Sequence, residues 1–304
     1  MSKTWSPFSF TLPMPWGELA GNTWGNDQNS PVLVVHGRQD NSGTFDPLMP
    51  SLPQEYFYVC IDLPGHGKSS HFAPGAPLKF FDYVLMLKRV IDHFKWKEIT
   101  FIGHSFGGQI SLFLAALYPE LVKKIIAFDC IGPDCVETPD MVNHYRKQFD
   151  EFMSQEKKLS GGSPPSYSYE EALHRVKNNR WLSTLTEEAG KTLIARSLVS
   201  GANGYYFSTD QRFKIRVTPA LTSNQQIAVY KKIQCPVLLI LADESVKAFF
   251  AKDAVIKSCY DYFTTTAPNV SVRMVKGNHD VHLNNPERVL PLVKSFLSND
   301  RSKL

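Results

Sequence analysis

The sequence predicts an α/β fold, a doubly wound and mostly parallel sheet with an inserted helical cap. Short runs of β-branched and aliphatic residues alternate along the chain with segments whose apolar residues recur at helical spacing. Several runs are apolar throughout, as is typical of parallel strands that are buried on both faces. A stretch of about 100 residues interrupts this alternation once before it resumes.

The first elements predict one edge and the centre of the sheet. Segments 8–12 and 18–23 flank a turn-rich connection at 13–17, so we expect an antiparallel hairpin at a sheet edge. The strand expected at 31–35 ends in His36-Gly37-Arg38, at the strand end where α/β sheets bind their ligands. Further elements are a short helix at 45–52, a strand at 56–62 and a helix at 80–94.

A Gly-x-Ser-x-Gly pattern centred on Ser105 lies between the next expected strand, 98–102, and a helix at 109–118. A buried strand that reverses sharply into a helix leaves the serine oxygen pointing outward, and Gly103 and Gly107 have no Cβ atoms to collide in such a turn. The free amides of the helix start, notably that of Phe106, point toward the same place. The pattern therefore predicts a nucleophile elbow; the alternative is a serine that only caps the helix.

The long interruption follows a strand expected at 124–129. We interpret residues 133–231 as an inserted helical cap, and residues 1–132 and 232–304 as the α/β core domain. The cap has expected helices at 141–154, 170–180 and 187–198. Its aromatic residues could line an apolar pocket, although simple packing is favoured for each one: they include Tyr167, Tyr169, Trp181, Tyr205, Tyr206 and Phe207.

The chain then returns to strands and helices. Strands are expected at 236–241 and 270–275, and helices at about 248–260 and 286–297. His279 lies in the loop after the last strand, within Gly277-Asn278-His279-Asp280-Val281-His282. A histidine that leaves the carboxyl end of a strand is placed where the sheet would hold a base above Ser105. Three other histidines, His36, His66 and His104, are expected to pack loops.

These motifs together resemble those of the α/β-hydrolase family over nearly the whole chain. The residues that carry the resemblance are His36-Gly37, Gly103-His104-Ser105-Phe106-Gly107-Gly108 and Gly277-Asn278-His279. Segments 36–46, 62–70 and 277–288 are similar, more narrowly, to the serine hydrolase-like proteins, also known as the kraken-like group. Arg38 departs from that group, in which a tryptophan is expected.

The resemblance implies a serine hydrolase that cleaves an ester, thioester or related acyl bond through an acyl-enzyme. Ser105 would be the nucleophile and His279 the base, and the backbone amides of Phe106 and Arg38 would form the oxyanion hole. A serine excludes the mechanism of the haloalkane dehalogenases and the usual epoxide hydrolases of this fold, which need a carboxylate nucleophile. The Arg38 side chain could meet an anionic substrate, but pairing with Asp40 or another acid is favoured.

Two positions compete for the carboxylate that orients His279. The usual place in the family lies after the strand at 237–241, three positions beyond a small residue; if Ala242 is that residue, Ser245 stands where the acid belongs. Asp243 is close to this position but shifted in the loop. Asp129 closes the strand at 125–128, and some members of the fold are similar in carrying their acid there. We therefore expect Asp129 as the orienting acid, with Asp243 as the alternative.

Composition limits the partners and the compartment. The 304 residues include 43% apolar residues, and the net charge of +4 is spread without a long basic run, so nucleic acid is not an expected partner. The five cysteines have no paired metal-ligand spacing, and neither a metal nor an organic cofactor is expected. No apolar stretch is long enough to span a membrane.

Two further expectations concern location and activity. The sequence ends in Ser302-Lys303-Leu304, a peroxisomal address that an import receptor would read; without that import the protein would be cytoplasmic. A small-molecule acyl compound is the expected substrate. The alternative function is a catalytically inactive α/β-hydrolase fold that serves as a binding or scaffold protein, because the fold alone does not determine activity.

Overall fold

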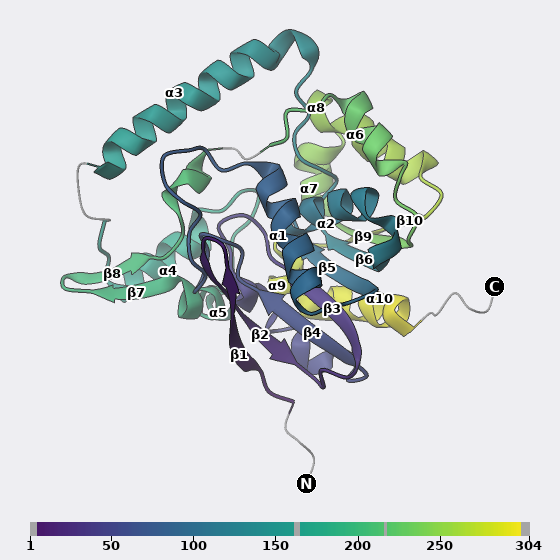
Figure 1. The fold of residues 1–304 in the computed structure, drawn as a ribbon, viewed down its shortest axis with the longest axis horizontal. Coiled ribbons are helices and arrows are strands. Elements are labelled where there is room, and N and C mark those ends of the chain that lie inside the picture. Colours follow the sequence, from purple (N-terminus) through teal and green to yellow (C-terminus); the bar gives the residue numbers. More distant parts are fainter. Residues whose placement is uncertain (1–4, 161–164, 216–217, 299–304) are drawn as a thin grey trace.

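The computed structural model describes residues 5–160, 165–215 and 218–298. It is organised around one eight-stranded sheet, whose place among the helices can be followed in Figure 1. The strand order is β1-β2-β4-β3-β5-β6-β9-β10. No helix formed by the described residues is long and apolar enough to cross a membrane. The tripeptide Ser302-Lys303-Leu304 lies outside the described residues, so the peroxisomal address stays a prediction.

The sheet is mostly parallel, as predicted. Antiparallel pairing is confined to one edge, where β1 pairs with β2 and β2 pairs with β4, and the predicted edge hairpin is confirmed. All other neighbours are parallel. The strands are β1 (Phe8–Met14), β2 (Gly17–Trp24), β3 (Ser30–Val35), β4 (Tyr56–Ile61), β5 (Ile99–His104), β6 (Val122–Phe128), β9 (Val237–Ala242) and β10 (Val270–Val275).

Both faces of the sheet are covered, which explains why the central strands are apolar throughout. Along β3, Leu33 and Val35 belong to one buried cluster, whereas Val32 and Val34 belong to the other, as the two-residue period of a strand requires. The first cluster is closed by α1 (Phe80–His93), α2 (Phe106–Leu117) and α8 (Ala254–Asp261). The second is closed by α10 (Pro286–Ser298) and by the short 3₁₀ helices η1 (Ser42–Phe45) and η2 (Met49–Ser51).

Two predicted helices are irregular in the structure. The helix expected at 45–52 is replaced by η1 and η2. The helix expected at 248–260 is interrupted: its first residues belong to a π-helical turn, η6 (Val246–Phe250), and its later ones to α8. The three-residue α7 (Asp243–Ser245) precedes η6, and a second π turn, η7 (Tyr262–Thr266), follows α8. The chain restarts its helix at Asp253, whose carbonyl accepts a hydrogen bond of 2.9 Å from the amide of Lys257. The short α9 (Val281–Asn284) precedes α10.

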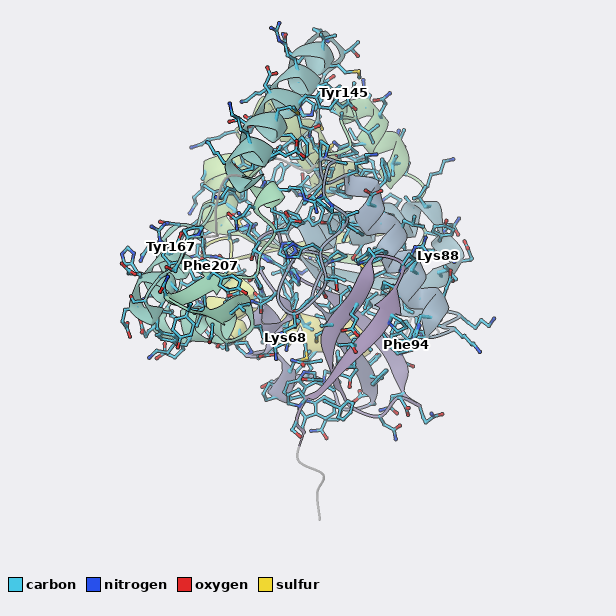
Figure 2. All side chains as sticks on the ribbon, turned by 60° about the vertical axis from the view of Figure 1, so that its left-hand side comes forward. Lys68, Lys88, Phe94, Tyr145, Tyr167 and Phe207 are labelled. Atoms are coloured by element: carbon cyan, nitrogen blue, oxygen red, sulfur yellow. The ribbon has the colours of Figure 1, made fainter. Side chains whose placement is uncertain are left out.

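Residues 133–231, named here the insertion, contain helices and a small hairpin outside the main sheet (Figure 1). The helices are α3 (Met141–Ser160), α4 (Tyr169–Asn178), α5 (Glu187–Ser197) and α6 (Ser223–Tyr230), with the 3₁₀ helix η5 (Gln211–Lys214). The hairpin of β7 (Leu198–Gly201) and β8 (Gly204–Phe207) was not predicted. Figure 2 shows Tyr167 and Phe207 together on this side, well apart from Phe94 after α1.

Two arginines connect the insertion to loops of the sheet. Arg196 of α5 pairs with the buried Asp62 at 2.6 Å, and Arg180, which follows α4, pairs with the buried Asp280 at 2.6 Å. The last helix, α6, contacts α2 and α8 and so joins the helical layer over the sheet. The division between core and cap at residue 231 therefore stays a prediction.

Candidate active site

Three predicted site residues come together at the carboxyl ends of parallel strands. Ser105 follows β5, Asp129 follows β6 and His279 lies in the loop after β10. Nε2 of His279 lies 3.0 Å from Oγ of Ser105, and Nδ1 of the same ring lies 2.6 Å from Oδ2 of Asp129. The strand order β5-β6-β9-β10 brings these strand ends to one edge of the sheet although the residues are far apart in sequence.

The turn at Ser105 has the geometry expected of a sharp strand-to-helix reversal. Its φ is 49° and its ψ is −118°, in a region that residues with a Cβ rarely adopt. The Ser105 amide donates to the carbonyl of Phe128 over 3.0 Å, which fixes the turn to β6. A Cβ on Gly103 would lie 2.6 Å from the amide nitrogen of Gly108, and one on Gly107 would collide with the carbonyl of Val35. The glycines therefore allow α2 to start directly against the sheet.

Asp129 is buried and its carboxylate has a donor on each side. Oδ1 accepts from the amide of Ala242 at 2.7 Å, and Oδ2 accepts from the hydroxyl of Ser245 at 2.5 Å. The backbone also has a positive φ, 47°, and its amide donates to the carbonyl of Ile240. Ser245 thus stands where the family pattern has an acid and instead binds the acid that β6 supplies.

The alternative acid, Asp243, binds elsewhere. Its Oδ1 accepts from the amide of Gly277 at 2.9 Å, and its Oδ2 pairs with Lys247 at 2.7 Å. The hydrogen bond from Lys247, together with that from Gly277, lowers the pKa of Asp243. Asp243 therefore supports the backbone of the loop that holds His279, while the ring nitrogen Nδ1 faces Asp129.

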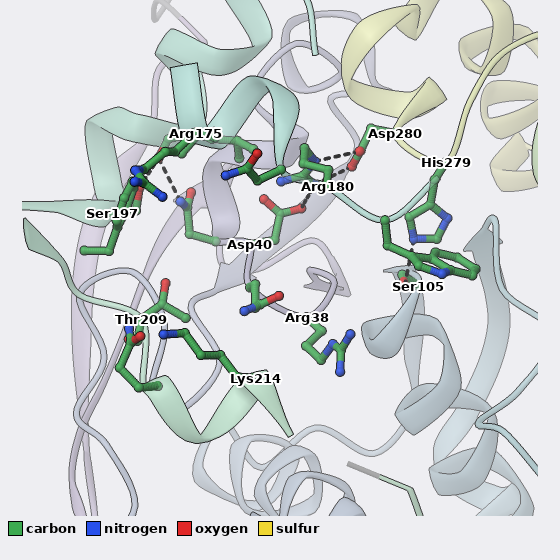
Figure 3. A pocket seen from close by; sticks show the side chains of 18 of the residues that line it. Arg38, Asp40, Ser105, Arg175, Arg180, Ser197, Thr209, Lys214, His279 and Asp280 are labelled. Atoms are coloured by element: carbon green, nitrogen blue, oxygen red, sulfur yellow. Dashed lines mark hydrogen bonds and ion pairs between the residues drawn. The ribbon is translucent and has the colours of Figure 1, made fainter. Parts of the chain in front are cut away.

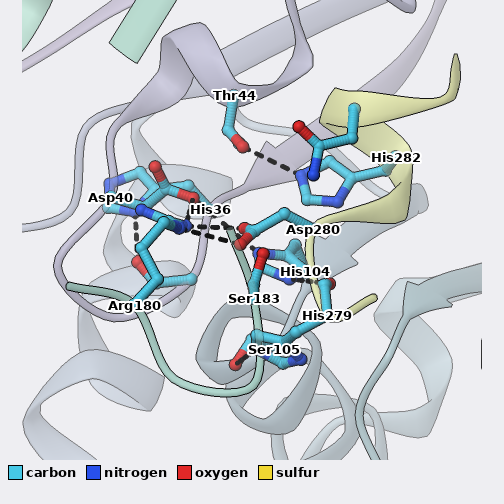
Figure 4. A network of polar contacts seen from close by, with 12 residues as sticks. His36, Asp40, Thr44, His104, Ser105, Arg180, Ser183, His279, Asp280 and His282 are labelled. Carbon is cyan, nitrogen blue, oxygen red and sulfur yellow. Dashed lines mark hydrogen bonds and ion pairs between the residues drawn. The ribbon is translucent and has the colours of Figure 1, made fainter. Parts of the chain in front are cut away.

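Two residues of the insertion, Arg180 and Trp181, contact the loop that carries His279. Figure 4 shows Arg180 beside Asp280 of this loop. Arg180 makes two hydrogen bonds to the carboxylate of Asp280, of 2.6 and 2.8 Å, and its guanidinium lies 3.6 Å from Asp40. The Trp181 ring meets the His279 ring edge to face, with centroids 4.8 Å apart and an interplanar angle of 89°. Sequence reasoning missed Arg180, and nothing in its local pattern distinguishes it from a surface arginine.

Burial and ion pairing shift the pKa values of the two acids that face Arg180 in opposite directions. Burial raises the pKa of Asp40 to about 7, despite the nearby guanidinium. Asp280 is also buried, which favours its neutral form, but the guanidinium of Arg180 outweighs this and holds the pKa of Asp280 below its ordinary value. The neighbouring imidazoles stay neutral, because burial lowers the pKa of His104 well below its ordinary value and that of His282 to about 3.

One group of side chains in the described part of the chain has the spacing of a metal site. Asp40, His104 and Asp280 offer ligand atoms that all lie within 4.8 Å of one another. Arg180 is paired with both carboxylates, so its positive charge already occupies the position that a cation would need. We therefore assign these residues to an ion-pair network rather than to a metal centre.

The predicted oxyanion amides lie next to Ser105. Phe106 is the first residue of α2, where an amide has no carbonyl partner within its own helix. A Cβ on Gly37 would lie 3.2 Å from the Cβ of Ser105, so the Gly37–Arg38 peptide runs directly past the serine. His66 accepts a hydrogen bond of 2.9 Å from the amide of Gln39 and thereby fixes this loop.

The other histidines expected to pack loops are also buried among backbone groups. Nε2 of His36 accepts from the amide of Leu63 at 2.8 Å, and burial lowers the pKa of His36 to about 4, so the ring is neutral. Nε2 of His104 lies 3.0 Å from the carbonyl of His279. Both rings hold the loops around Ser105.

A cavity of about 350 Å³ opens beside Ser105 and His279 (Figure 3). Three of the six aromatic residues proposed for a pocket line it: Tyr167, Trp181 and Phe207. Much of the remaining lining is polar and comes from the insertion: Arg175, Asn179, Arg180, Ser197, Thr209, Gln211 and Lys214. The cavity is therefore mixed in character, with three aromatic rings beside charged and hydroxyl side chains of the insertion.

Comparisons with known proteins agree with this geometry. The alpha/beta hydrolase fold family matches residues 30–286. A serine hydrolase-like protein of Danio rerio is 35% identical over 294 residues, covering 95% of this chain and 87% of that protein. Serine hydrolase-like protein 2 of Homo sapiens is 32% identical, covering 94% of this chain and 92% of its own length.

Solved structures resemble the fold over nearly its whole length. A hypothetical protein of Pseudomonas aeruginosa PAO1 has a TM-score of 0.82 at 25% identity and covers 96% of this chain and 99% of its own. A thioesterase domain from the curacin biosynthetic pathway has a TM-score of 0.76 at 21% identity, covering 95% of this chain and 99% of its own. With strand order, family match and relatives in agreement, the chain belongs to the α/β-hydrolase family and to its serine hydrolase-like proteins.

Proposed function

We propose that the protein is a serine hydrolase that cleaves an ester, thioester or related acyl bond. The observation that carries this proposal is the pair of contacts made by His279, 3.0 Å to Ser105 and 2.6 Å to Asp129. An imidazole with a carboxylate on one nitrogen and a hydroxyl on the other can remove the hydroxyl proton as the oxygen attacks. The esterases and thioesterases among the structural neighbours share this fold and are consistent with acyl chemistry.

The reaction would proceed in two halves. Oγ of Ser105 attacks the acyl carbon while Nε2 of His279 takes its proton, and Asp129 stabilises the cationic ring through Nδ1. The amides of Phe106 and Arg38 donate to the carbonyl oxygen as it becomes negative. His279 then protonates the leaving alcohol or thiol, and an acyl-enzyme remains. Water attacks this ester with His279 again as the base, which releases the acid and restores Ser105.

A fluorophosphonate probe and a panel of acyl esters and thioesters test the proposal. We expect covalent labelling and hydrolysis by the wild type, and loss of both in Ser105→Ala. Ser200→Ala is the matched control, because this serine is exposed on β7 and is not among the residues that line the cavity. A folded wild type that neither reacts with the probe nor cleaves any ester would favour the non-catalytic scaffold.

A further inference from the structure

The end of the cavity away from Ser105 carries an excess of positive charge (Figure 3). Four cationic side chains and two carboxylates line the cavity: Arg38, Arg175, Arg180 and Lys214 against Asp40 and Asp280. Both carboxylates lie beside Arg180, at 3.6 and 2.6 Å. Arg175 and Lys214, at the end away from Ser105, face neither of these two acids.

Arg175 and Lys214 have the surroundings of side chains that can receive a ligand. The guanidinium of Arg175 lies 4.6 Å from the centroid of the Tyr167 ring, an arrangement that orients its plane and leaves N–H groups at its edge available. Glu171, one turn earlier on α4, is held in a capping box by the amide of Ser168 at 2.8 Å. Lys214 is exposed and has no carboxylate partner among the residues that the structure describes.

We propose that this end of the cavity binds an anionic group on the substrate, a carboxylate or a phosphate, several bonds away from the reacting carbonyl. Arginine matches both anions with its planar fork of donors, lysine adds a point charge, and the hydroxyls of Thr209 and Ser197 line the same space. The substrate is then an acyl ester or thioester with a second, charged end. This inference rests on the proposed function only for the end of the substrate that reacts with Ser105.

Matched substrates measure the contribution of the anion. The p-nitrophenyl monoester of a medium-chain dicarboxylic acid is compared with its methyl-capped, neutral counterpart and with an ω-phosphate ester of the same length. We expect kcat/KM for a charged ester to exceed that for the neutral ester by roughly 10- to 100-fold, the range of one charge-assisted hydrogen bond. The difference should lie in KM and should shrink as salt increases. The anion that gives the larger ratio identifies the group.

Charge reversal assigns the effect to the two residues. Arg175→Glu/Lys214→Glu should lower kcat/KM for the charged ester far more than for the neutral ester and so remove the preference. Lys214→Glu alone, at an exposed position, should lower the preference in part. Arg89→Glu/Lys252→Glu makes the same change of charge at exposed sites away from the cavity and should keep the preference. A preference that survives in the cavity variant would overturn the proposal.

A binding measurement separates this inference from the catalytic proposal. Calorimetric titration of Ser105→Ala with the free dicarboxylate and with inorganic phosphate needs no turnover. Binding that disappears in the additional Arg175→Glu/Lys214→Glu background supports the subsite even if no ester is cleaved. Cleavage of the neutral ester without any preference, or the absence of binding by both anions, overturns the subsite and leaves the serine hydrolase intact.

Discussion

The two ends of the cavity are built by different parts of the chain. At the sheet end, the backbone of Ser105 is bonded to β6 and that of Asp129 is bonded to β9, so strand register sets the positions of the side chains. At the insertion end, Arg175 and Lys214 project from a helix and a short 3₁₀ helix that belong to no strand of the sheet. The difference separates two tasks in the proposed function: the sheet holds the proposed reacting groups, and the insertion can change what is recognised without altering them.

The sharpest test of the sheet end compares its two acids. Asp129→Asn should lower turnover by roughly 10⁴-fold, because an amide can neither hold the ring in the same tautomer nor stabilise its cation. Asp243→Asn is the matched control and should keep most of the activity, since Asp243 binds Gly277 and Lys247. Rates of ester hydrolysis, with circular dichroism to verify folding, give the comparison. The reverse order of losses would make Asp243 the orienting acid.

The next effect concerns the ion pair of Arg180 and Asp280, which connects the insertion to the loop of His279. Arg180→Met leaves the carboxylate of Asp280 buried without its cation, and removal of one partner from such a pair destabilises by about 3–5 kcal/mol. Urea unfolding measures the loss. Arg180→Met/Asp280→Asn should recover much of it, because the charge is then gone. Lys247→Met removes one partner of an exposed pair and should have a much smaller effect. An equal loss at both positions would contradict a buried ion pair.

The pH dependence of stability tests Asp40, which lies 3.6 Å from the same arginine. Its pKa is raised from an ordinary value of 3.8 to about 7, so the folded protein binds more protons than the unfolded chain between these values. The contribution of Asp40 to stability is therefore complete below about pH 4 and is lost as the pH rises to 7, at up to about 1.4 kcal/mol per pH unit. Asp40→Asn should remove this decline. Parallel pH profiles for the two proteins would show that Asp40 does not titrate there.

The smallest effect belongs to the insertion alone. Ser168 caps α4 through a reciprocal bond with Glu171, and Ser168→Ala should lower the stability of that helix by about 1 kcal/mol. Hydrogen exchange at the α4 amides reports the loss. The rate of fluorophosphonate labelling at Ser105 should stay at its wild-type value; a slower rate would show that the two ends are coupled more strongly than their construction indicates.

Sequence reasoning reached the sheet end because strand ends are local features. Apolar runs located the strands, and Ser105, Asp129 and His279 each follow one of them. The β7–β8 hairpin was missed, although Asn203-Gly204 before an aromatic run is a known hairpin signal. The Ser245–Asp129 bond was beyond reach, since it joins residues 116 positions apart and depends on which strands are neighbours.

Arg180, at the insertion end, was missed for the same reason: its contact joins residues that are far apart in sequence. Its partner Asp280 is 100 positions away, and no periodicity records which way a side chain leaves the end of a helix. The aromatic residues were identified by type, but only the packing of the insertion determines that Tyr167 lines the cavity and Tyr169 does not. The proposed recognition residues on the insertion therefore need a structure, whereas the proposed reacting groups on strand ends need little more than their motifs.

At Ser105 and Asp129 the backbone has a positive φ angle, which lowers stability but positions the side chains for the proposed chemistry. Each of these residues holds its backbone in a region that is costly for any side chain, by roughly 1–3 kcal/mol, and glycine would relax it. Screens for thermal stability alone should accordingly enrich glycine at position 105. At position 129 glycine would instead leave the buried Ala242 amide and Ser245 hydroxyl without their acceptor. A lineage that no longer needed the proposed reaction would be free to drift the same way at position 105.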